Sequence, residues 1–300
     1  MYINDLGIMV PVYDNSYKKS DFQGSAYFNV IVMYFLSHKH DNSCVIFNEP
    51  YSKNIKNHPP LFYKNHTHDN TCVLLPNNIH DIPNNQTDVS LRWVQEGSTK
   101  KGYISVPNPT DMFWANFKKC YNNNCSEEKG CTDVKTRKRF IVLPFGYNCD
   151  DSGHANYLIY DIDKRILERF ESYGKQANSS TCINPKDLDK KILKLFTDNL
   201  GKDFVTKYRV LKNHNFQTIQ ENEKQMSTKN DPVGFCSIWC AWFIDLKLSN
   251  PNTDTDILLD KALNILKKLK KEHKLSFTSF IRNYSKLIVD VSNEIKLMYE

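Results

Sequence analysis

The sequence lacks the short motifs that usually mark nucleotide-dependent enzymes, α/β-type serine hydrolases and zinc proteins. It contains no GxGxxG, P-loop or GxSxG element, and no HExxH, CxxC or HxxxH spacing. Histidines and cysteines gather in residues 58–80, and cysteines in residues 120–131, but without the paired spacing of a structural zinc site. We therefore predict that the protein uses no cofactor and no metal ion.

Signals for export and for membrane insertion are also missing. Residues 1–5 lack the basic start and apolar run of a signal peptide. The longest apolar stretch, residues 26–36, contains Asn29 and is too short to span a bilayer. The nine cysteines are an odd number with irregular spacing, which in a chain without an export signal favours reduced thiols over a disulfide framework. These absences predict an intracellular, cytoplasmic protein that makes no contact with a membrane.

The composition is that of a folded protein with a modest positive charge. Hydrophobic residues make up 40% and aromatic residues 12% of the 300 residues, which suffices for one large domain or two small ones. The formal net charge of +6 permits a weak contact with nucleic acid or an acidic partner without requiring it. The lysine cluster at residues 267–271 is most simply the solvated side of an amphipathic helix. The alternative is a basic surface that binds nucleic acid or an acidic partner.

Residues 1–100 are predicted to form an N-terminal module of unknown role. Its runs 26–34 and 43–47 are rich in β-branched and aromatic residues, which predicts strands. Residues 50–90 are rich in Asn, His and Pro, which indicates an irregular loop. The boundary with the rest of the chain falls within residues 90–105.

Residues 101–252 form the predicted core, and residues 253–300 a helical extension. The patterns in the core predict helices over residues 111–120 and 185–201. They predict strands over residues 139–145, 157–161, 166–171 and 204–211. A polar turn at residues 163–165 makes the second and third of these strands an antiparallel hairpin. The segment after Gly234 is apolar on nearly every side, which indicates a buried helix. We therefore predict an α+β fold with a central, mostly antiparallel sheet and a buried helix.

Cys236, at the start of the buried helix, is the strongest chemical feature of the sequence. Unpaired amides and the macrodipole at a helix N-terminus stabilise a thiolate, and the same amides can bind the oxyanion of a tetrahedral intermediate. A helix cysteine taken alone is more often structural. Cys240 lies one turn deeper, away from the N-terminal amides, and is predicted to be a buried structural residue.

His154 and Glu171 are predicted neighbours across the hairpin. His154 lies where a loop enters the strand at residues 157–161, and Glu171 ends the following strand. Antiparallel strands joined by a tight turn bring the start of one beside the end of the other, as a general base and its orienting acid require. Glu168 alternates with Glu171 and is predicted to be a solvated carboxylate on the opposite face.

Three separated segments together resemble a known enzyme family: residues 153–156 (GHAN), 169–174 (RFESYG) and 234–242 (GFCSIWCAW). Their order of histidine, acidic residue and cysteine, with glutamines between the last two, resembles the cysteine proteases of the SUMO-deconjugating and adenovirus maturation superfamily, in particular thiol proteases of large DNA viruses. The likeness covers about residues 100–252. It implies a papain-like, circularly permuted cysteine protease fold.

The resemblance implies an endopeptidase with Cys236 as nucleophile, His154 as base and Glu171 as orienting acid. It also implies a protein or polypeptide substrate with small residues before the scissile bond, and a role in viral protein maturation or in removal of a ubiquitin-like modifier. Such a protein would work in the host cytoplasm or be packaged in the virion.

The chain departs from the family pattern in three places. Ala155 and Ser237 stand where most cellular members have Trp and Gly. The oxyanion glutamine of the family usually lies a few residues before the cysteine, whereas here the glutamines lie further upstream, in a longer loop. We assign the role to Gln217, with Gln220 close behind and Gln225 also upstream.

Two other functions are compatible with the same residues. Bacterial effector acetyltransferases use a similar order of His, Glu and Cys with acetyl-coenzyme A as donor, so acyl transfer is one alternative. A protein-binding module that has kept the fold without activity is the other. The complete set of three residues argues against the binding module, because binding does not need them.

Overall fold

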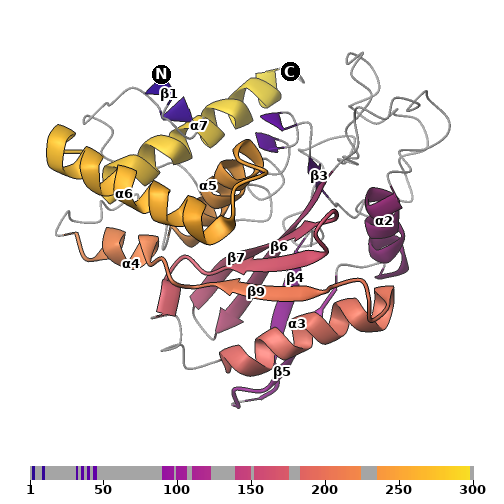
Figure 1. Ribbon diagram of the computed structural model, residues 1–300. Coiled ribbons are helices and arrows are strands. Elements are labelled where there is room, and N and C mark those ends of the chain that lie inside the picture. The colour runs from indigo at the N-terminus through magenta and orange to yellow at the C-terminus, as the bar shows by residue number, and fades with distance from the viewer. Residues whose placement is uncertain are drawn as a thin grey trace, which may run out of the picture.

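The fold is taken from a computed structural model that describes residues 2–3, 9–10, 32, 35–36, 39–40, 43–45, 90–97, 99–106, 110–122, 139–149, 152–175, 183–223 and 235–297. A mixed sheet lies at its centre, with helices packed on both faces (Figure 1). This arrangement confirms the predicted α+β class. None of the helices in the described ranges is both long and apolar enough to cross a membrane.

The main sheet has the strand order β5-β4-β6-β7-β8-β9, with β3 also paired to β6. The pairs β4–β5, β6–β7 and β7–β8 are antiparallel, whereas β3–β6, β4–β6 and β8–β9 are parallel. The strands are β3 (Ser43–Val45), β4 (Leu91–Gln95), β5 (Gly102–Ser105), β6 (Phe140–Cys149), β7 (Ser152–Asp161), β8 (Ile166–Phe170) and β9 (Lys207–Leu211). The predicted hairpin is therefore present as β7–β8, while parallel strands extend the sheet beyond its antiparallel centre.

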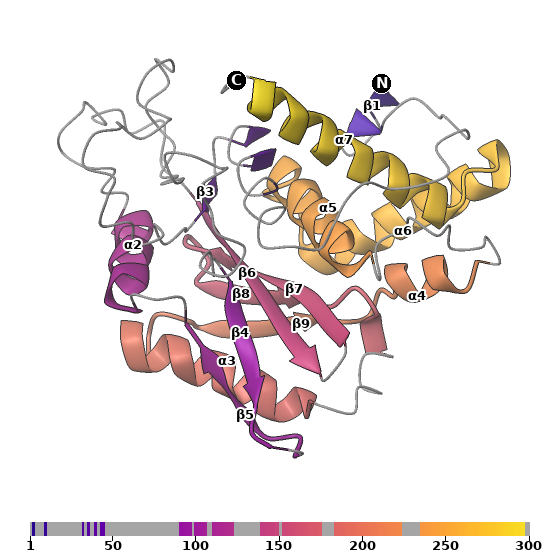
Figure 2. The same cartoon turned by 180° about the vertical axis from the view of Figure 1, so that it is seen from behind.

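Alternate residues of the central strands face two separate apolar cores. On β6, Phe140 and Val142 face one core, and Ile141 and Leu143 face the other. The first core lies under α5 (Cys236–Ser249), α6 (Thr255–His273) and α7 (Phe277–Leu297), and the second under α2 (Thr110–Asn122) and α3 (Pro185–Leu200). Seen from behind, β5 lies beside α3, where the Lys191 ammonium donates a hydrogen bond to the Gly102 carbonyl (Figure 2).

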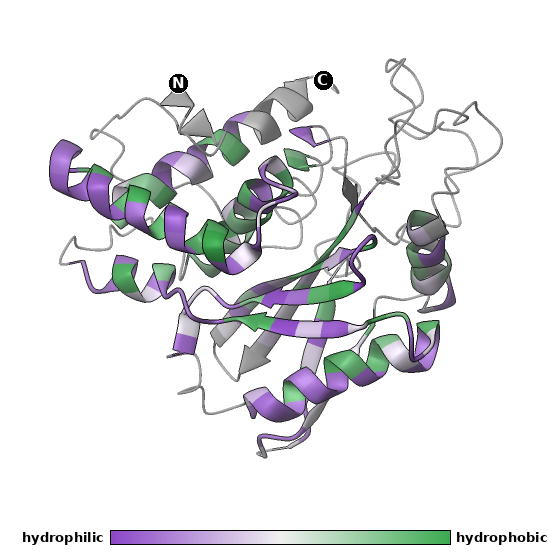
Figure 3. Cartoon of the chain, viewed as in Figure 1, coloured by the Kyte–Doolittle hydropathy of each residue, from purple (hydrophilic) through white to green (hydrophobic). Residues whose placement is uncertain are grey.

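The helix that carries Cys236, α5, is buried on all sides, as its sequence predicts. From Ser237 to Leu248 every residue is buried, including Trp239 and Trp242, which stack edge to face 5.4 Å apart. The neighbouring α6 instead mixes hydrophilic and hydrophobic residues around its surface (Figure 3). Its Lys267, Lys268, Lys270 and Lys271 are exposed, in agreement with the reading of this cluster as a solvated helix side. A helix enclosed in this way fixes the position of its first residue with little freedom.

A buried carboxylate ties α5 to the N-terminal part of the chain and to α7. Asp245 is completely buried and lies 2.8 Å from Lys39 Nζ, 2.6 Å from His40 Nε2 and 3.1 Å from the Tyr284 hydroxyl. Burial opposes ionisation of this carboxyl, but the bond to His40 and the charge of Lys39 hold its pKa below the ordinary value.

The structure differs from the N-terminal predictions in two ways. Val32, predicted within a strand, is helical, as are Phe35, Leu36 and Lys39; the rest of residues 26–34 lie outside the described residues. Val32 and Leu36 are fully buried in the first core at helical spacing, so tertiary packing overrides their β-propensity. In addition, β3 and β4 pair with β6 in the main sheet. The predicted domain boundary between residues 100 and 101 therefore separates strands that hydrogen-bond to each other.

Two smaller features complete the fold. A separate pair of strands, β1 (Tyr2–Ile3) and β2 (Met9–Val10), is antiparallel, and the short helix α4 (Phe216–Glu221) lies in a segment predicted only as polar. Cys236 and Cys240 are free thiols, whereas Cys120 is disulfide-bonded, so the prediction of reduced thiols is wrong for that residue.

Candidate active site

The β7–β8 hairpin brings His154 and Glu171 into contact. Its register pairs Tyr157 with Phe170, so His154 and Glu171, just beyond this pair, lie at the same end of the hairpin. His154 Nε2 is 2.7 Å from Glu171 Oε1, and only 9% and 5% of the two side chains are exposed. The adjacency inferred from strand pairing is therefore observed.

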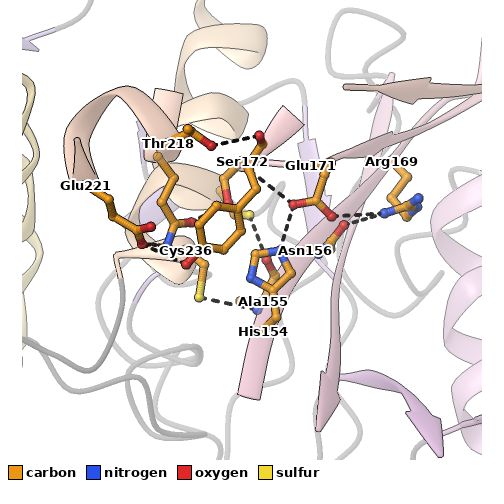
Figure 4. Close-up of polar contacts among 12 residues, drawn as sticks. His154, Ala155, Asn156, Arg169, Glu171, Ser172, Thr218, Glu221 and Cys236 are labelled. Carbon is orange, nitrogen blue, oxygen red and sulfur yellow. Dashed lines mark hydrogen bonds and ion pairs between the residues drawn. The ribbon is translucent and has the colours of Figure 1, made fainter. Parts of the chain in front are cut away.

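The N-terminus of α5 places the Cys236 thiol against the start of β7 (Figure 4). The backbone N–H of Ala155, directly after His154, donates to Cys236 Sγ at 3.4 Å. Glu171 contacts His154 through Nε2, and the same imidazole is near enough to the Cys236 thiol to lower its pKa. Cys236 as a residue is partly exposed, whereas Cys240 is buried.

The charges of this group favour a thiolate and an imidazolium. Burial by itself would raise the pKa of the Cys236 thiol, but the hydrogen bond and charge of His154, with the amides of Ala155 and Ser237, lower it below its ordinary value. Burial likewise opposes the charged form of His154, yet the Glu171 carboxylate and the Cys236 sulfur raise its pKa to about 10. Both shifts favour an ion pair of the Cys236 thiolate and the His154 imidazolium.

Arg169 and the backbone hold the Glu171 carboxylate in place. Arg169 Nη1 lies 3.4 Å from Glu171 Oε2 and donates to Asn156 Oδ1 at 2.7 Å, while the Tyr173 backbone N–H donates to Glu171 Oε1 at 3.2 Å. Although burial would raise the pKa of Glu171, the His154 imidazolium and then Arg169 lower it below the ordinary value. Arg169 is itself fixed by Asp189 of α3, whose Oδ1 lies 3.0 Å from the arginine Nε.

Two tyrosines hold the His154 ring from its sides. The ring centroid of Tyr147, its cross-strand partner on β6, lies 5.0 Å from that of His154, and the centroid of Tyr173 lies 5.1 Å away. The two rings thus supply aromatic packing on the histidine.

Gln217, the predicted oxyanion residue, lies beside the turn that follows Glu171. Its backbone N–H donates to the Ser172 carbonyl at 3.0 Å, and its side chain is fully buried. The Ser172 hydroxyl donates to Gln217 Oε1 at 2.7 Å, which directs the amide nitrogen the other way, toward Glu221 Oε1 at 3.0 Å. Of the alternatives, Gln220 is buried with its side-chain oxygen unpaired, and Gln225 lies outside the described residues.

Cys240 and Glu168 occupy different surroundings. Cys240 is buried and its thiol donates to the Ala155 carbonyl at 3.4 Å; burial first, and then the nearby Cys236, raise its pKa well above the ordinary value. Glu168 is on the opposite face, as predicted, but it is buried rather than solvated. The Thr255 hydroxyl donates to its Oε2 at 2.8 Å, and Arg209 Nη1 lies 3.3 Å from its Oε1.

Among the residues that the structure describes, no group of three or more His, Cys, Asp and Glu side chains could hold a metal ion. The side chains of this site can supply nucleophilic attack by sulfur and proton transfer by an oriented imidazole.

Known proteins give limited similarity to this chain. No family model matches it. A protein of Acanthamoeba polyphaga mimivirus, described as an ankyrin repeat protein, is 29% identical over 167 residues, which make up 53% of this chain and 21% of that protein. The chain thus spans about a fifth of the length of this curated relative.

Three solved structures are similar in part. ChlaDub1 from Chlamydia trachomatis matches 95% of this chain and 96% of its own, with a TM-score of 0.39 and 12% identity. The Chlamydia trachomatis effector Cdu1 bound to ubiquitin matches 60% of this chain and 75% of its own, with a TM-score of 0.31 and 14% identity. The C-terminal Ulp1 protease domain in complex with Smt3, the yeast SUMO orthologue, matches 62% of this chain and 63% of its own, with a TM-score of 0.28 and 14% identity. Since all these TM-scores lie below 0.5, function has to be argued from the residues of the site.

Several site residues were not predicted from the sequence. Arg169 precedes Glu171 by two positions on a strand, so strand alternation could have placed both on one face. Tyr147 could not be found in this way, because its position opposite His154 depends on the register of β6 with β7. The Ala155 amide carries no side-chain signal at all.

Proposed function

We propose that the protein is a cysteine endopeptidase that hydrolyses peptide or isopeptide bonds with Cys236, His154 and Glu171. The observation that carries this proposal is a buried imidazole that contacts a carboxylate through Nε2 and lies close enough to the partly exposed residue Cys236 to lower the pKa of its thiol. A base between a nucleophile and an orienting acid is the arrangement that activates sulfur for acyl transfer.

The first half of the reaction forms a thioester. The Cys236 thiolate attacks the substrate carbonyl, and the charge that develops on the oxygen is held by amide donors near the α5 N-terminus and by the Gln217 side chain. The tetrahedral intermediate collapses as the imidazolium of His154 gives its proton to the leaving amine. Glu171, fixed by Arg169, keeps the imidazole oriented throughout.

The second half returns the enzyme to its resting state. His154, now neutral, takes a proton from water, which attacks the thioester and releases the carboxylate product and the Cys236 thiolate. No step needs a cofactor. The substrate is a polypeptide, cut either in viral protein maturation or in removal of a ubiquitin-like modifier, in the host cytoplasm or in the virion. The similarity to a mimivirus protein supports the viral setting.

A proteomic comparison of new N-termini tests this function. Wild-type protein and Cys236→Ala are each incubated with a whole-cell protein extract, and Cys240→Ser serves as the matched control because Cys240 is buried one turn deeper. We expect new termini with wild type and with Cys240→Ser, and none with Cys236→Ala. Ubiquitin and SUMO with a C-terminal fluorogenic amide separate removal of modifiers from maturation.

Three results would contradict the proposal. Equal termini from Cys236→Ala would exclude this nucleophile. Acetylated proteins in the presence of acetyl-coenzyme A, without cleavage, would favour an acetyltransferase. A protein that binds partners without either product would be a binding module.

A further inference from the structure

Two side-chain donors beside the candidate triad converge on one oxygen atom. The Tyr173 hydroxyl donates to Glu221 Oε1 at 2.7 Å, and the Gln217 amide nitrogen donates to the same atom at 3.0 Å. The oxygen belongs to a carboxylate and therefore carries negative charge. Two donors within about 3 Å of one anionic oxygen are the geometry of an oxyanion-binding site.

The two donors are fixed by buried contacts. The Ser172 hydroxyl, 2.7 Å from Gln217 Oε1, fixes which end of the amide faces Glu221. The Thr218 hydroxyl donates to the Tyr173 carbonyl at 3.0 Å, and this bond ties the tyrosine to α4. Gln217 is fully buried, whereas Glu221, the last residue of α4, is exposed. The donors are therefore held rigidly while the carboxylate can rotate into solvent.

The converging pair lies close to the nucleophile. The Tyr173 ring packs on His154, with centroids 5.1 Å apart, and the Glu221 carboxylate points toward the Cys236 side of the site (Figure 4). Burial first, then the bond to Glu221, and also the Cys236 thiolate raise the pKa of Tyr173. Its hydroxyl consequently stays protonated and remains a donor at any pH at which the enzyme works.

We propose that the Tyr173 hydroxyl is a second oxyanion donor alongside Gln217, and that the Glu221 carboxylate occupies the oxyanion site until the substrate displaces it. This inference rests on the proposed function. In the resting state Glu221 keeps the two donors aimed at one point and satisfies them. When a substrate carbonyl enters, the carboxylate turns into solvent, and the donors bind the substrate oxygen as it becomes negative.

The sequence gives a reason for such an arrangement. The family glutamine normally stands a few residues before the cysteine, whereas Gln217 lies 19 positions before Cys236 by their numbers, on a different helix. A glutamine so placed depends on its partners on α4 and on the turn after Glu171 for its orientation. Tyr173 and Glu221 are those partners.

A peptide aldehyde tests this proposal, because its reaction makes an oxyanion without releasing a leaving group. The Cys236 sulfur adds to the aldehyde carbon, the carbonyl electron pair moves to oxygen, and that oxygen takes the proton from His154 to give a hemithioacetal. Alkylation by iodoacetamide at the same sulfur expels iodide and forms no oxyanion. The two reagents therefore separate oxyanion binding from the reactivity of the thiolate.

The probe is acetyl-glycyl-glycinal, with protection of Cys236 from iodoacetamide as the readout of its affinity. Tyr173→Phe should weaken aldehyde binding and lower kcat on a cleaved peptide by about 10-fold to 100-fold, as loss of an oxyanion donor does. Glu221→Ala should tighten aldehyde binding by about 3-fold to 10-fold, because it removes a competitor for the two donors. Both variants should be alkylated at the wild-type rate. Tyr103→Phe and Glu272→Ala, at exposed positions, are the matched controls.

The outcomes that would overturn the proposal differ from failure of the proposed function. Unchanged aldehyde affinity in Glu221→Ala, a surface change expected to leave the fold intact, would overturn it even if Tyr173→Phe does not fold. Slower alkylation of Tyr173→Phe would show that the tyrosine acts through His154 instead. If wild type cleaves nothing and its Cys236 binds no aldehyde, the protease function itself has failed.

Discussion

Two buried glutamates on or next to β8 show how similar surroundings lead to different chemistry. Glu168 faces α6, and it is satisfied by the Thr255 hydroxyl of α6 and by Arg209 of β9. Glu171 faces the start of β7, where Arg169 and His154 satisfy it. Burial raises the pKa of Glu168, whereas His154 and Arg169 overcome the same effect of burial at Glu171. Both glutamates are buried beside an arginine, and what distinguishes Glu171 is its contact with an imidazole.

The largest effect on kcat/KM should come from removing the His154 imidazole, which contacts Glu171 and not Glu168. We expect His154→Ala to lower kcat/KM by about 10³-fold or more, since the nucleophile loses its base. In wild type the alkylation rate of Cys236 should persist well below pH 8, because the thiol pKa is lowered. In His154→Ala the midpoint should return toward a free thiol, about 8.5. Equal midpoints near that value in both proteins would show that the residues are uncoupled.

A smaller effect should distinguish the two carboxylates directly. Glu171→Ala should lower kcat/KM by about 10-fold to 10³-fold, since an imidazole without its orienting acid keeps part of its basicity. Glu168→Ala should leave kcat/KM within about 2-fold but lower the free energy of unfolding by roughly 1 to 3 kcal/mol, because Thr255 and Arg209 lose a buried acceptor. Steady-state kinetics and urea unfolding measure both. A greater kinetic loss in Glu168→Ala would reverse the assignment.

The smallest effect concerns the sign of the pH dependence of stability. The lowered pKa of Glu171 means that its ionisation stabilises the fold above the unfolded-state pKa, about 4.3, and that this contribution is lost as pH falls through the folded-state value. The raised pKa of Glu168 has the opposite sign, so its ionisation costs stability as pH rises.

Urea unfolding between pH 3 and pH 7 measures this difference. From acid to neutral pH, Glu171→Gln should gain less stability than wild type, and Glu168→Gln should gain more, each by roughly 1 kcal/mol. Parallel curves for the two variants would mean that their surroundings do not differ electrostatically.

The parts of the site that the sequence predicts are those set by local pattern. The position of Cys236 follows from an apolar helix behind a glycine, and the pair of His154 and Glu171 follows from one tight hairpin. These features need only the periodicities of helix and strand. The α+β class and most helix and strand positions between residues 110 and 297 follow in the same way.

The parts that the sequence could not predict depend on contacts between distant segments. The parallel pairing of β3 and β4 with β6 has no local signal, and neither has the position of Tyr147 beside His154. The short helix α4 is polar enough to resemble a loop, so the meeting of Glu221 with Tyr173 was not foreseen. Val32 is helical against its intrinsic preference because a core position is available one turn from Leu36.

The carboxylate of Asp245 decides where this protein can be shortened. Lys39 and His40 come from the part of the chain that sequence patterns separate from the core, yet both contact this carboxylate on the helix that carries Cys236. A truncated protein that starts at residue 101 would lose both contacts and, of the Asp245 partners among the described residues, keep the Tyr284 hydroxyl. Uncompensated buried charges of this kind cost about 3 to 5 kcal/mol, which is a large share of the stability of a typical domain. Lys39 and His40 thus help to hold the helix that carries Cys236 in its folded position.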